Sequence, residues 1–289
     1  MWWPLGKSQN TMKPVNHLKS LYWDWRSDLF GTKRVNRFLR RYAAKGSTLS
    51  LAKAILSGTA HRGYCPICDS RTIFVIEGPW LRDEYRCRGC RSIPRFRHIV
   101  DVLRKQFPDY RTLSIHESSP HGPVLKLLRR EVPEYTSSHF WPDVPLGVSR
   151  NEIRCENLEK LTFKNESFDL FITQDVLEHV LNPKTAFREI ARTLKPGGAH
   201  IFTIPWYAPK RTLTRASFSG QEIIYHEPKE YHGNPIDDGG ALVVTEWGSD
   251  LGAFIFENGG LHTTAFLTLD RTRGLDGEFL EVFVSRKAQ

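Results

Sequence analysis

The segment that decides the fold is "LEKLTFKNESFDLFITQDVLEHVLNPKTAFREIARTLKPGGAHIFTIP", residues 158–205. It contains a short apolar run at 169–174 that has the length of a buried strand. An amphipathic helix is expected over 183–195, and a second apolar run follows at 200–205. A strand, a helix and a strand at this spacing predict two parallel strands that are joined by a helix packed on one face of the sheet.

The same alternation continues on both sides of this segment. We expect further strands at 112–116, 135–140 and 152–158, and further helices at 96–107 and 122–132. A long loop or insertion at 206–243 interrupts the alternation of strands and helices. Beyond it, a helix is expected within 245–260, with Thr245 or its neighbour as the cap and Gly259 and Gly260 as the stop. Two last strands follow and can pair antiparallel. These elements predict the α/β class.

Charge is distributed unevenly along the 289 residues, whose formal net charge is +9. Residues 1–110 hold 21 basic and 8 acidic side chains, and residues 111–289 hold 20 and 24. Residues 1–60 are expected to form a basic helical extension. The basic front third predicts nucleic acid, an anionic membrane surface or a phosphorylated substrate as partner, and a solvated basic surface is the alternative. No run of 18 apolar residues and no secretory signal is visible, which favours a cytoplasmic protein without a transmembrane segment.

Four of the five cysteines form two matched pairs with eighteen residues between them. Each Cys-x-x-Cys turn can aim two thiolates at one point, and two such turns complete a tetrahedron around zinc. A shell of four thiolates leaves no open position, so a structural zinc ribbon is predicted over residues 61–95. Nearby arginines can contact phosphates or link the ribbon to the next helix. The expected zinc ligands are Cys65, Cys68, Cys87 and Cys90.

Together, these motifs resemble a class I S-adenosylmethionine-dependent methyltransferase, type 11-like, with a zinc ribbon ahead of it. In that family, "LTFKNESFDLFIT" leads into the fourth strand and "DVLEHV" follows at its carboxyl end. "REIARTLKPGG" then leads into a fifth strand, "AHIFTIP". The resemblance covers roughly residues 96–289. It implies a Rossmann-like, mostly parallel sheet of seven strands with an antiparallel last strand, methyltransferase activity, and S-adenosylmethionine as the cofactor.

The first cofactor loop implied by the resemblance, "SIHESSP", departs from the family pattern. His116, Ser118 and Pro120 stand where glycines are usual, and Ser114 stands at a position that is often acidic. Glu117 is the acid in this loop, and we expect it to bind the amino group of the methionine moiety. A degenerate loop that binds no cofactor is the alternative.

The ends of the next strands complete the implied cofactor site. His139 stands where an acid usually binds the ribose, with Asp143 as an alternative. Asn157 and the adjacent Glu156 stand where the adenine is bound. The residues that the resemblance implies for the cofactor are Ser114, His116, Glu117, Ser118, His139, Glu156, Asn157, Gln174 and Asp175.

The insertion at 206–243 is the expected substrate side, because it follows the fifth strand. We expect His232 to be the general base, with His226 as the second candidate, and Asp175 to lie at the reactive edge. A small-molecule or glycan acceptor is favoured for the methyl group, on an oxygen or a nitrogen. An RNA methyltransferase that uses the ribbon and the basic front, and a non-catalytic binding protein, are the alternatives.

Overall fold

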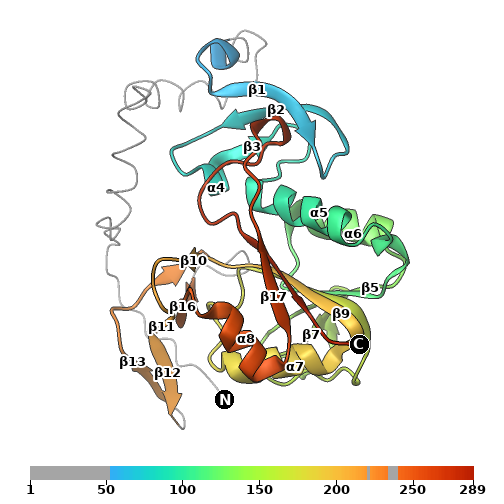
Figure 1. Cartoon of the computed structure of the whole chain (residues 1–289), viewed down its shortest axis with the longest axis vertical. Coiled ribbons are helices and arrows are strands. Elements are labelled where there is room, and N and C mark those ends of the chain that lie inside the picture. Colours follow the sequence, from blue (N-terminus) through green and yellow to red (C-terminus); the bar gives the residue numbers. More distant parts are fainter. Residues whose placement is uncertain (1–52, 220–221, 234–239) are drawn as a thin grey trace.

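The computed structural model describes residues 53–219, 222–233 and 240–289, so most of the expected basic extension at 1–60 lies outside it. A central sheet of eight strands organises the described chain (Figure 1). In spatial order its strands are β17 (His262–Phe266), β18 (Val282–Arg286), β9 (Leu194–Thr203), β8 (Phe168–Gln174), β4 (Ile115–Ser118), β5 (Tyr135–His139), β7 (Ile153–Cys155) and β6 (Ser149–Arg150).

The strand directions confirm the predicted α/β class. The five strands from β9 to β7 are parallel, and β18 lies antiparallel between β9 and β17. The short edge strand β6, which pairs antiparallel with β7, was not predicted and brings the sheet from seven strands to eight. No helix in the described ranges is long and apolar enough to cross a membrane.

Helices cover both faces of the sheet. Leu170 and Ile172 of β8 belong to one hydrophobic core, with α5 (Pro94–Gln106) and α6 (Gly122–Glu131). Phe171 points the other way, into a second core with α7 (Pro183–Thr193) and α8 (Leu251–Gly259). Because side chains alternate between the two faces and both faces are buried, the three central residues of β8 (170–172) are all apolar.

The cysteine-containing segment forms a separate antiparallel sheet against α5 (Figure 1). It consists of β1 (Ala60–Cys65), β2 (Ser70–Ile76) and β3 (Tyr85–Cys87), with the short helix α4 (Leu81–Glu84) before β3. The connection between β17 and β18, which includes the 3₁₀ turn η2 (Arg271–Arg273), packs against this sheet. A Cβ atom at Gly63 would lie 2.3 Å from the carbonyl oxygen of Thr272, so only glycine permits this approach.

Short strands organise the described part of the insertion. One small sheet has the order β10-β16-β11, and two strand pairs lie beside it in the chain. The elements are β10 (Trp206–Tyr207), β11 (Leu213–Thr214), β12 (Ala216–Ser219), β13 (Glu222–Tyr225), β14 (Tyr231–His232), β15 (Ala241–Leu242) and β16 (Thr245–Gly248). The insertion is therefore structured, not simply a long loop.

The predicted start of the last helix is wrong. Thr245 does not cap it but begins β16, and α8 starts only at Leu251, after Asp250. Buried Trp247 explains the shift, because β16 pairs with β10 and β11 and places this ring against Phe187 of α7. The predicted stop is confirmed, since Gly260 ends the helix in the left-handed conformation with φ of 66°.

Candidate functional site

An acidic side chain directly after β8 joins the ribbon to the central sheet. Asp175 Oδ2 accepts hydrogen bonds from Arg82 Nη2 at 2.6 Å and from Arg95 Nη1 at 2.7 Å. Its Oδ1 accepts one from the Thr203 hydroxyl at 2.9 Å. Burial by itself would raise the pKa of Asp175, but the two guanidinium groups and the hydroxyl hold it well below its usual range. Both oxygens of the predicted catalytic carboxylate are thus engaged within the protein.

Three further titratable groups gather beside Asp175. One ligand atom from each of Glu178, His179 and His232 lies within 4.8 Å of the others. Burial and the charge of Asp175 raise the pKa of Glu178 to about 8, and burial lowers that of His179 to about 4. Glu178 and His179 therefore favour their neutral forms in this buried position.

The structure separates the two histidines predicted as bases. His232 comes from β14 and lies with its Nδ1 3.9 Å from Glu178 Oε1. His226 follows β13, where its Nε2 pairs with the hydroxyl of Ser217 at 2.8 Å, and it does not belong to the group around Glu178. Of the two candidates, His232 is the one at the carboxyl end of β8.

Glu117 lies within β4 as a fully buried carboxyl group. The hydroxyl of Tyr135 donates to its Oε2 at 2.5 Å, and Gln174 Nε2 donates to its Oε1 at 2.7 Å. These two bonds favour the charged form, but burial outweighs them and raises the pKa of Glu117 to about 7. Glu117 and Gln174, both predicted to bind the cofactor, thus contact each other near the carboxyl ends of β4 and β8.

We expect the unfolding free energy of the protein to decrease as the pH rises from 4.5 to 7, because of Glu117. The folded state retains a proton that the unfolded chain loses above its ordinary pKa of 4.5. A difference of about 2.5 pKa units corresponds to about 3 kcal/mol of unfolding free energy. Glu117→Gln should remove this loss, as measured by urea unfolding at pH 5 and pH 8. An unchanged pH dependence in this variant would contradict the assignment.

Two other residues of the predicted first loop have side chains that are bonded within the sheet, away from the carboxyl ends of the strands. Ser114 precedes β4 at the amino end of the sheet, where its hydroxyl is 2.7 Å from Asp169 Oδ2 and 3.0 Å from Lys195 Nζ. His116 is fully buried, and both ring nitrogens pair with the hydroxyls of Thr136 and Ser138 on β5. Ligands of parallel sheets bind at the carboxyl ends of the strands, so Ser114 lies at the opposite end of the sheet from such a site.

The turn after β4 is made without glycine at its first positions. Ser118 is the last residue of β4 and is buried, and Ser119 adopts a left-handed conformation with φ of 55°. Gly122, with φ of 68°, opens α6. The Ser119 hydroxyl lies 3.2 Å from His139 Nδ1, so the ends of β4 and β5 are joined at this edge.

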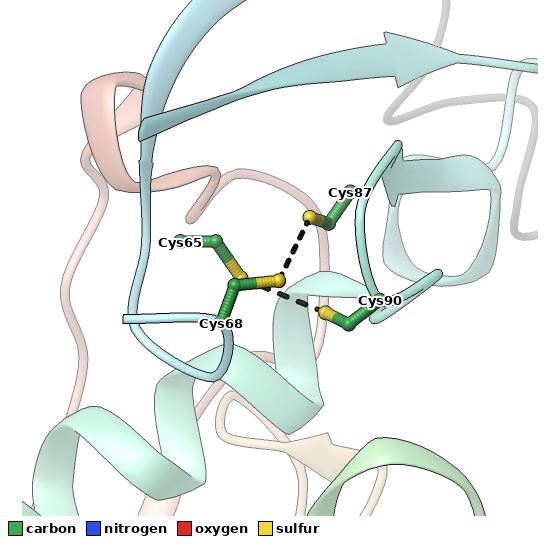
Figure 2. Close-up of side chains that lie close together, drawn as sticks. All are labelled: Cys65, Cys68, Cys87 and Cys90. Carbon is green, nitrogen blue, oxygen red and sulfur yellow. Dashed lines mark hydrogen bonds between the residues drawn. The ribbon is translucent and has the colours of Figure 1, made fainter. Parts of the chain in front are cut away.

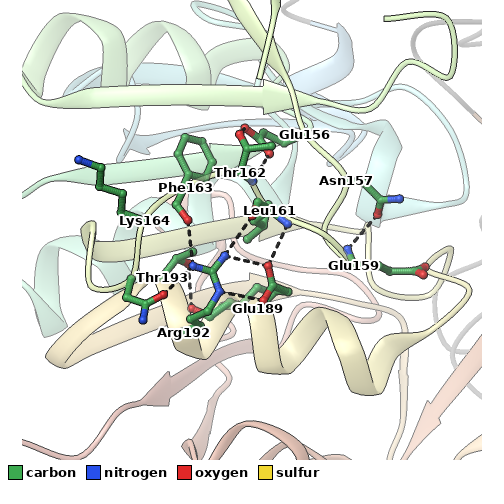
Figure 3. A network of polar contacts seen from close by, with 12 residues as sticks. Glu156, Asn157, Glu159, Leu161, Thr162, Phe163, Lys164, Glu189, Arg192 and Thr193 are labelled. Carbon is green, nitrogen blue, oxygen red and sulfur yellow. Dashed lines mark hydrogen bonds and ion pairs between the residues drawn. The ribbon is translucent and has the colours of Figure 1, made fainter. Parts of the chain in front are cut away.

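The predicted adenine-binding residues belong to a loop that is held by hydrogen bonds among its own residues and from α7 (Figure 3). The Glu156 carboxylate accepts hydrogen bonds from Arg154 and from the backbone and hydroxyl of Thr162. Asn157 Oδ1 accepts one from the backbone of Glu159 at 2.8 Å. Arg192 of α7 binds this loop through the carbonyl oxygens of Leu161 and Phe163. The polar side chains here stabilise the loop itself.

The four paired cysteines converge on one point (Figure 2). The sulfurs of Cys65 and Cys90 are 3.8 Å apart, and those of Cys68 and Cys87 are 3.7 Å apart. Each turn is closed by a backbone hydrogen bond of 2.9 Å, from Asp69 to Cys65 and from Arg91 to Cys87. Asp69 and Arg91 both have positive φ, of 55° and 63°, so the two turns have similar geometry. Cys155 lies apart from them, buried in β7.

Two arginines at the site were not predicted as site residues. Arg82 belongs to α4, and Arg95 lies in the first turn of α5; only 6% and 15% of their side-chain surfaces are exposed. Their contact with Asp175 spans at least 80 residues of sequence, a separation at which no local pattern indicates a partner. Of the two roles considered for the arginines near the cysteines, Arg95 and Arg97 perform the linking one, since Arg97 donates to the carbonyl oxygens of Tyr85 and Gly274.

A comparison with protein-family models finds a match in this part of the chain. Residues 123–202 match a family model described as a methyltransferase domain. The match begins in α6 and ends in β9, so it includes β5, β7 and β8 together with Asp175, Glu178 and His179. This agrees with the resemblance of residues 158–205.

Two curated proteins are similar over short segments. A protein of Methanocaldococcus jannaschii without an assigned function is 40% identical over 72 residues, 25% of this chain and 30% of that protein. The ubiquinone biosynthesis O-methyltransferase of Parvibaculum lavamentivorans is 33% identical over 63 residues, 22% of this chain and 24% of that protein. The chain therefore matches less than a third of the length of either relative.

Among solved structures, an S-adenosylmethionine-dependent methyltransferase from Mesorhizobium loti aligns with 66% of this chain and 98% of its own. The sequence identity is 16% and the TM-score is 0.43.

Proposed function

We propose that this chain is an S-adenosylmethionine-dependent methyltransferase that transfers a methyl group to an oxygen or nitrogen of a small molecule or glycan. The observation that carries the proposal is the methyltransferase-domain match over residues 123–202, on a parallel sheet whose carboxyl edge holds a cluster of titratable side chains. In an open sheet of this kind, ligands bind at the carboxyl ends of the strands.

The residues at this edge fit such a cofactor. Ser119 and Gly122 have positive φ, so the turn after β4 is tight even though the usual glycines are replaced. Gln174 Oε1 is buried and has no hydrogen-bond partner among the described residues, so it can accept from an ammonium or amine group. His139 and Asn157 follow at the ends of β5 and β7 and are proposed to bind the ribose and the adenine. The cofactor, when bound, supplies an already activated methyl group.

The four thiolates fit a structural zinc ion. Zinc–sulfur bonds of about 2.3 Å in a tetrahedron place the sulfurs about 3.8 Å apart. The two measured pairs, at 3.8 Å and 3.7 Å, agree with this spacing. Within the proposed function, the zinc stabilises the ribbon, and Arg82 and Arg95 hold the ribbon to Asp175 at the edge of the sheet.

His232 is proposed to be required for removal of the acceptor proton, because it lies beside Glu178 on the insertion. We expect His232→Ala to lower methyl transfer by about 10²- to 10⁴-fold, which is the usual contribution of acid–base catalysis. Binding of S-adenosylmethionine should persist. Transfer of labelled methyl groups measures the first effect and calorimetry the second. Loss of transfer in His226→Ala instead would reverse the two assignments.

The proposed function is tested by calorimetry of the zinc-loaded chain with S-adenosylmethionine and S-adenosylhomocysteine. Binding of both is expected, and binding of neither would support the non-catalytic alternative. Labelled methyl groups are then offered to separate pools of small molecules, glycans and RNA. Incorporation into RNA alone, with strong salt dependence, would favour the RNA methyltransferase instead.

A further inference from the structure

Glu178 is a buried carboxylate whose environment is incomplete. It is 1% exposed, and neither of its oxygens has a hydrogen-bond partner among the described residues. Buried carboxyl groups are ordinarily hydrogen-bonded, paired with a cation or bound to a metal, because burial without a partner is costly. The two neighbouring imidazoles, of His179 and His232, lie at the same point.

The hydrogen bonding of His179 determines which of its ring nitrogens faces Glu178. Its Nδ1 is 2.8 Å from the carbonyl oxygen of Leu242, which can only accept, so Nδ1 carries the hydrogen. The Nε2 atom therefore presents a lone pair, 3.8 Å from Glu178 Oε1. At 3.8 Å, neither the charged nor the protonated carboxyl group of Glu178 forms a hydrogen bond with this nitrogen. A positively charged species between them would satisfy both.

The spacing of the three groups suits a shared ion better than hydrogen bonds. The distances from Glu178 Oε1 to His179 Nε2 and His232 Nδ1 are 3.8 Å and 3.9 Å, beyond the range of a hydrogen bond. Two ligands of one tetrahedral cation, with bonds of about 2.1 Å, lie about 3.4 Å apart. Small rotations of the imidazole rings would close the difference.

We propose that Glu178, His179 and His232 bind one divalent transition-metal cation at the carboxyl end of β8. Two imidazoles and one carboxylate form a ligand set that suits zinc, manganese or ferrous iron and leaves coordination positions open. Asp175 is not a ligand, because Arg82, Arg95 and Thr203 engage its oxygens.

The surrounding backbone already supports this arrangement. The Glu178 carbonyl oxygen accepts hydrogen bonds from the backbone of Val244 at 2.7 Å and Thr245 at 3.1 Å. His232 lies on β14, which pairs with β15, the strand that contains Leu242. The bond from His179 to Leu242 is the kind of outer contact that orients a metal-binding imidazole. The cation would thus join the insertion to the end of β8.

The open positions suit an oxygen donor, and this part rests on the proposed function: a hydroxyl group of the methyl acceptor can occupy one of them. As a ligand, His232 would help to hold the cation, which would lower the pKa of the bound hydroxyl. The hydroxyl proton would then pass to solvent water, and its oxygen would accept the methyl group. The acceptor class is accordingly narrowed to hydroxylated molecules.

The test titrates the full chain, loaded with one equivalent of zinc for the four thiolates, with Mn²⁺ and measures free Mn²⁺ by electron paramagnetic resonance. Mn²⁺ prefers oxygen and imidazole ligands, so it does not displace the zinc of four thiolates. One Mn²⁺ per chain is expected. Glu178→Gln, which keeps the shape of the side chain, and His179→Ala should each weaken binding at least tenfold. His262→Ala, which removes an exposed imidazole at the start of β17, is the matched control and should bind as the wild type does.

Co²⁺ absorption is the second probe, since a site without thiolates gives no sulfur-to-cobalt charge-transfer band. Zinc content and thermal unfolding establish that each variant is folded. The proposal is overturned if the wild type binds neither Mn²⁺ nor Co²⁺, or if Glu178→Gln and His179→Ala bind them as tightly as the wild type. Cation binding without binding of S-adenosylmethionine would sustain this site and reject the proposed function, so the two failures are distinguishable.

Discussion

Replacing Cys87 by serine is expected to release the proposed zinc ion and unfold the sheet of β1, β2 and β3. A structural zinc site of this kind contributes on the order of 10 kcal/mol of binding free energy, which is folding free energy for the segment that it closes. Cys65 and Cys87 are also fully buried in the core shared with α5, so the loss should extend to the contact between ribbon and helix. Metal analysis and amide hydrogen exchange of β1–β3 measure the two effects.

Cys155→Ser is the matched control for this experiment, because Cys155 is buried in β7 and lies outside the cysteine cluster. It should retain the full zinc content. A Cys87→Ser chain that retains one zinc ion and native protection of β2 would show that the four sulfurs do not form the site. Chelation of zinc from the wild type should reproduce the effect of Cys87→Ser without any substitution.

Asp175→Ala is expected to destabilise the protein by about 3 kcal/mol, the usual effect of removing one partner from a buried ion pair. The substitution leaves the guanidinium groups of Arg82 and Arg95, which are largely covered, without their shared carboxylate. Because these arginines come from α4 and α5, the contact of the ribbon with the sheet should weaken as well. Denaturant unfolding and limited proteolysis measure the two effects.

The control is Asp83→Asn, which removes the charge of a partly exposed carboxylate 3.1 Å from the same Arg95. Surface ion pairs contribute less than about 1 kcal/mol, so this variant should be nearly as stable as the wild type. Equal stability of the two variants would contradict the role assigned to Asp175. The low pKa of Asp175 adds a pH dependence: its contribution is present above its ordinary pKa of 3.8 and is lost as the pH falls through the lower folded value.

The sequence by itself determined the α/β class, the strands at the centre of the sheet and the two matched cysteine turns. Each depends on local information: the continuous apolar run of β8, the amphipathic pattern of α7 and the fixed spacing of the cysteine pairs. Local information did not separate β16 from α8, because the pairing of Thr245–Gly248 with β10 and β11 joins segments that are more than 30 residues apart in sequence.

The tertiary structure alone decided which polar residues meet. Ser114 and Glu117 are three residues apart, yet Ser114 lies at the amino end of the sheet, while Glu117 is buried against Gln174. The arginines that hold Asp175 come from α4 and α5, and His232 reaches Glu178 only because β14 and β15 fold onto the end of β8. Such contacts depend on where distant elements pack. Hydrophobic periodicity and motif spacing describe residues that are near one another along the chain, so they contain no information about contacts between distant elements.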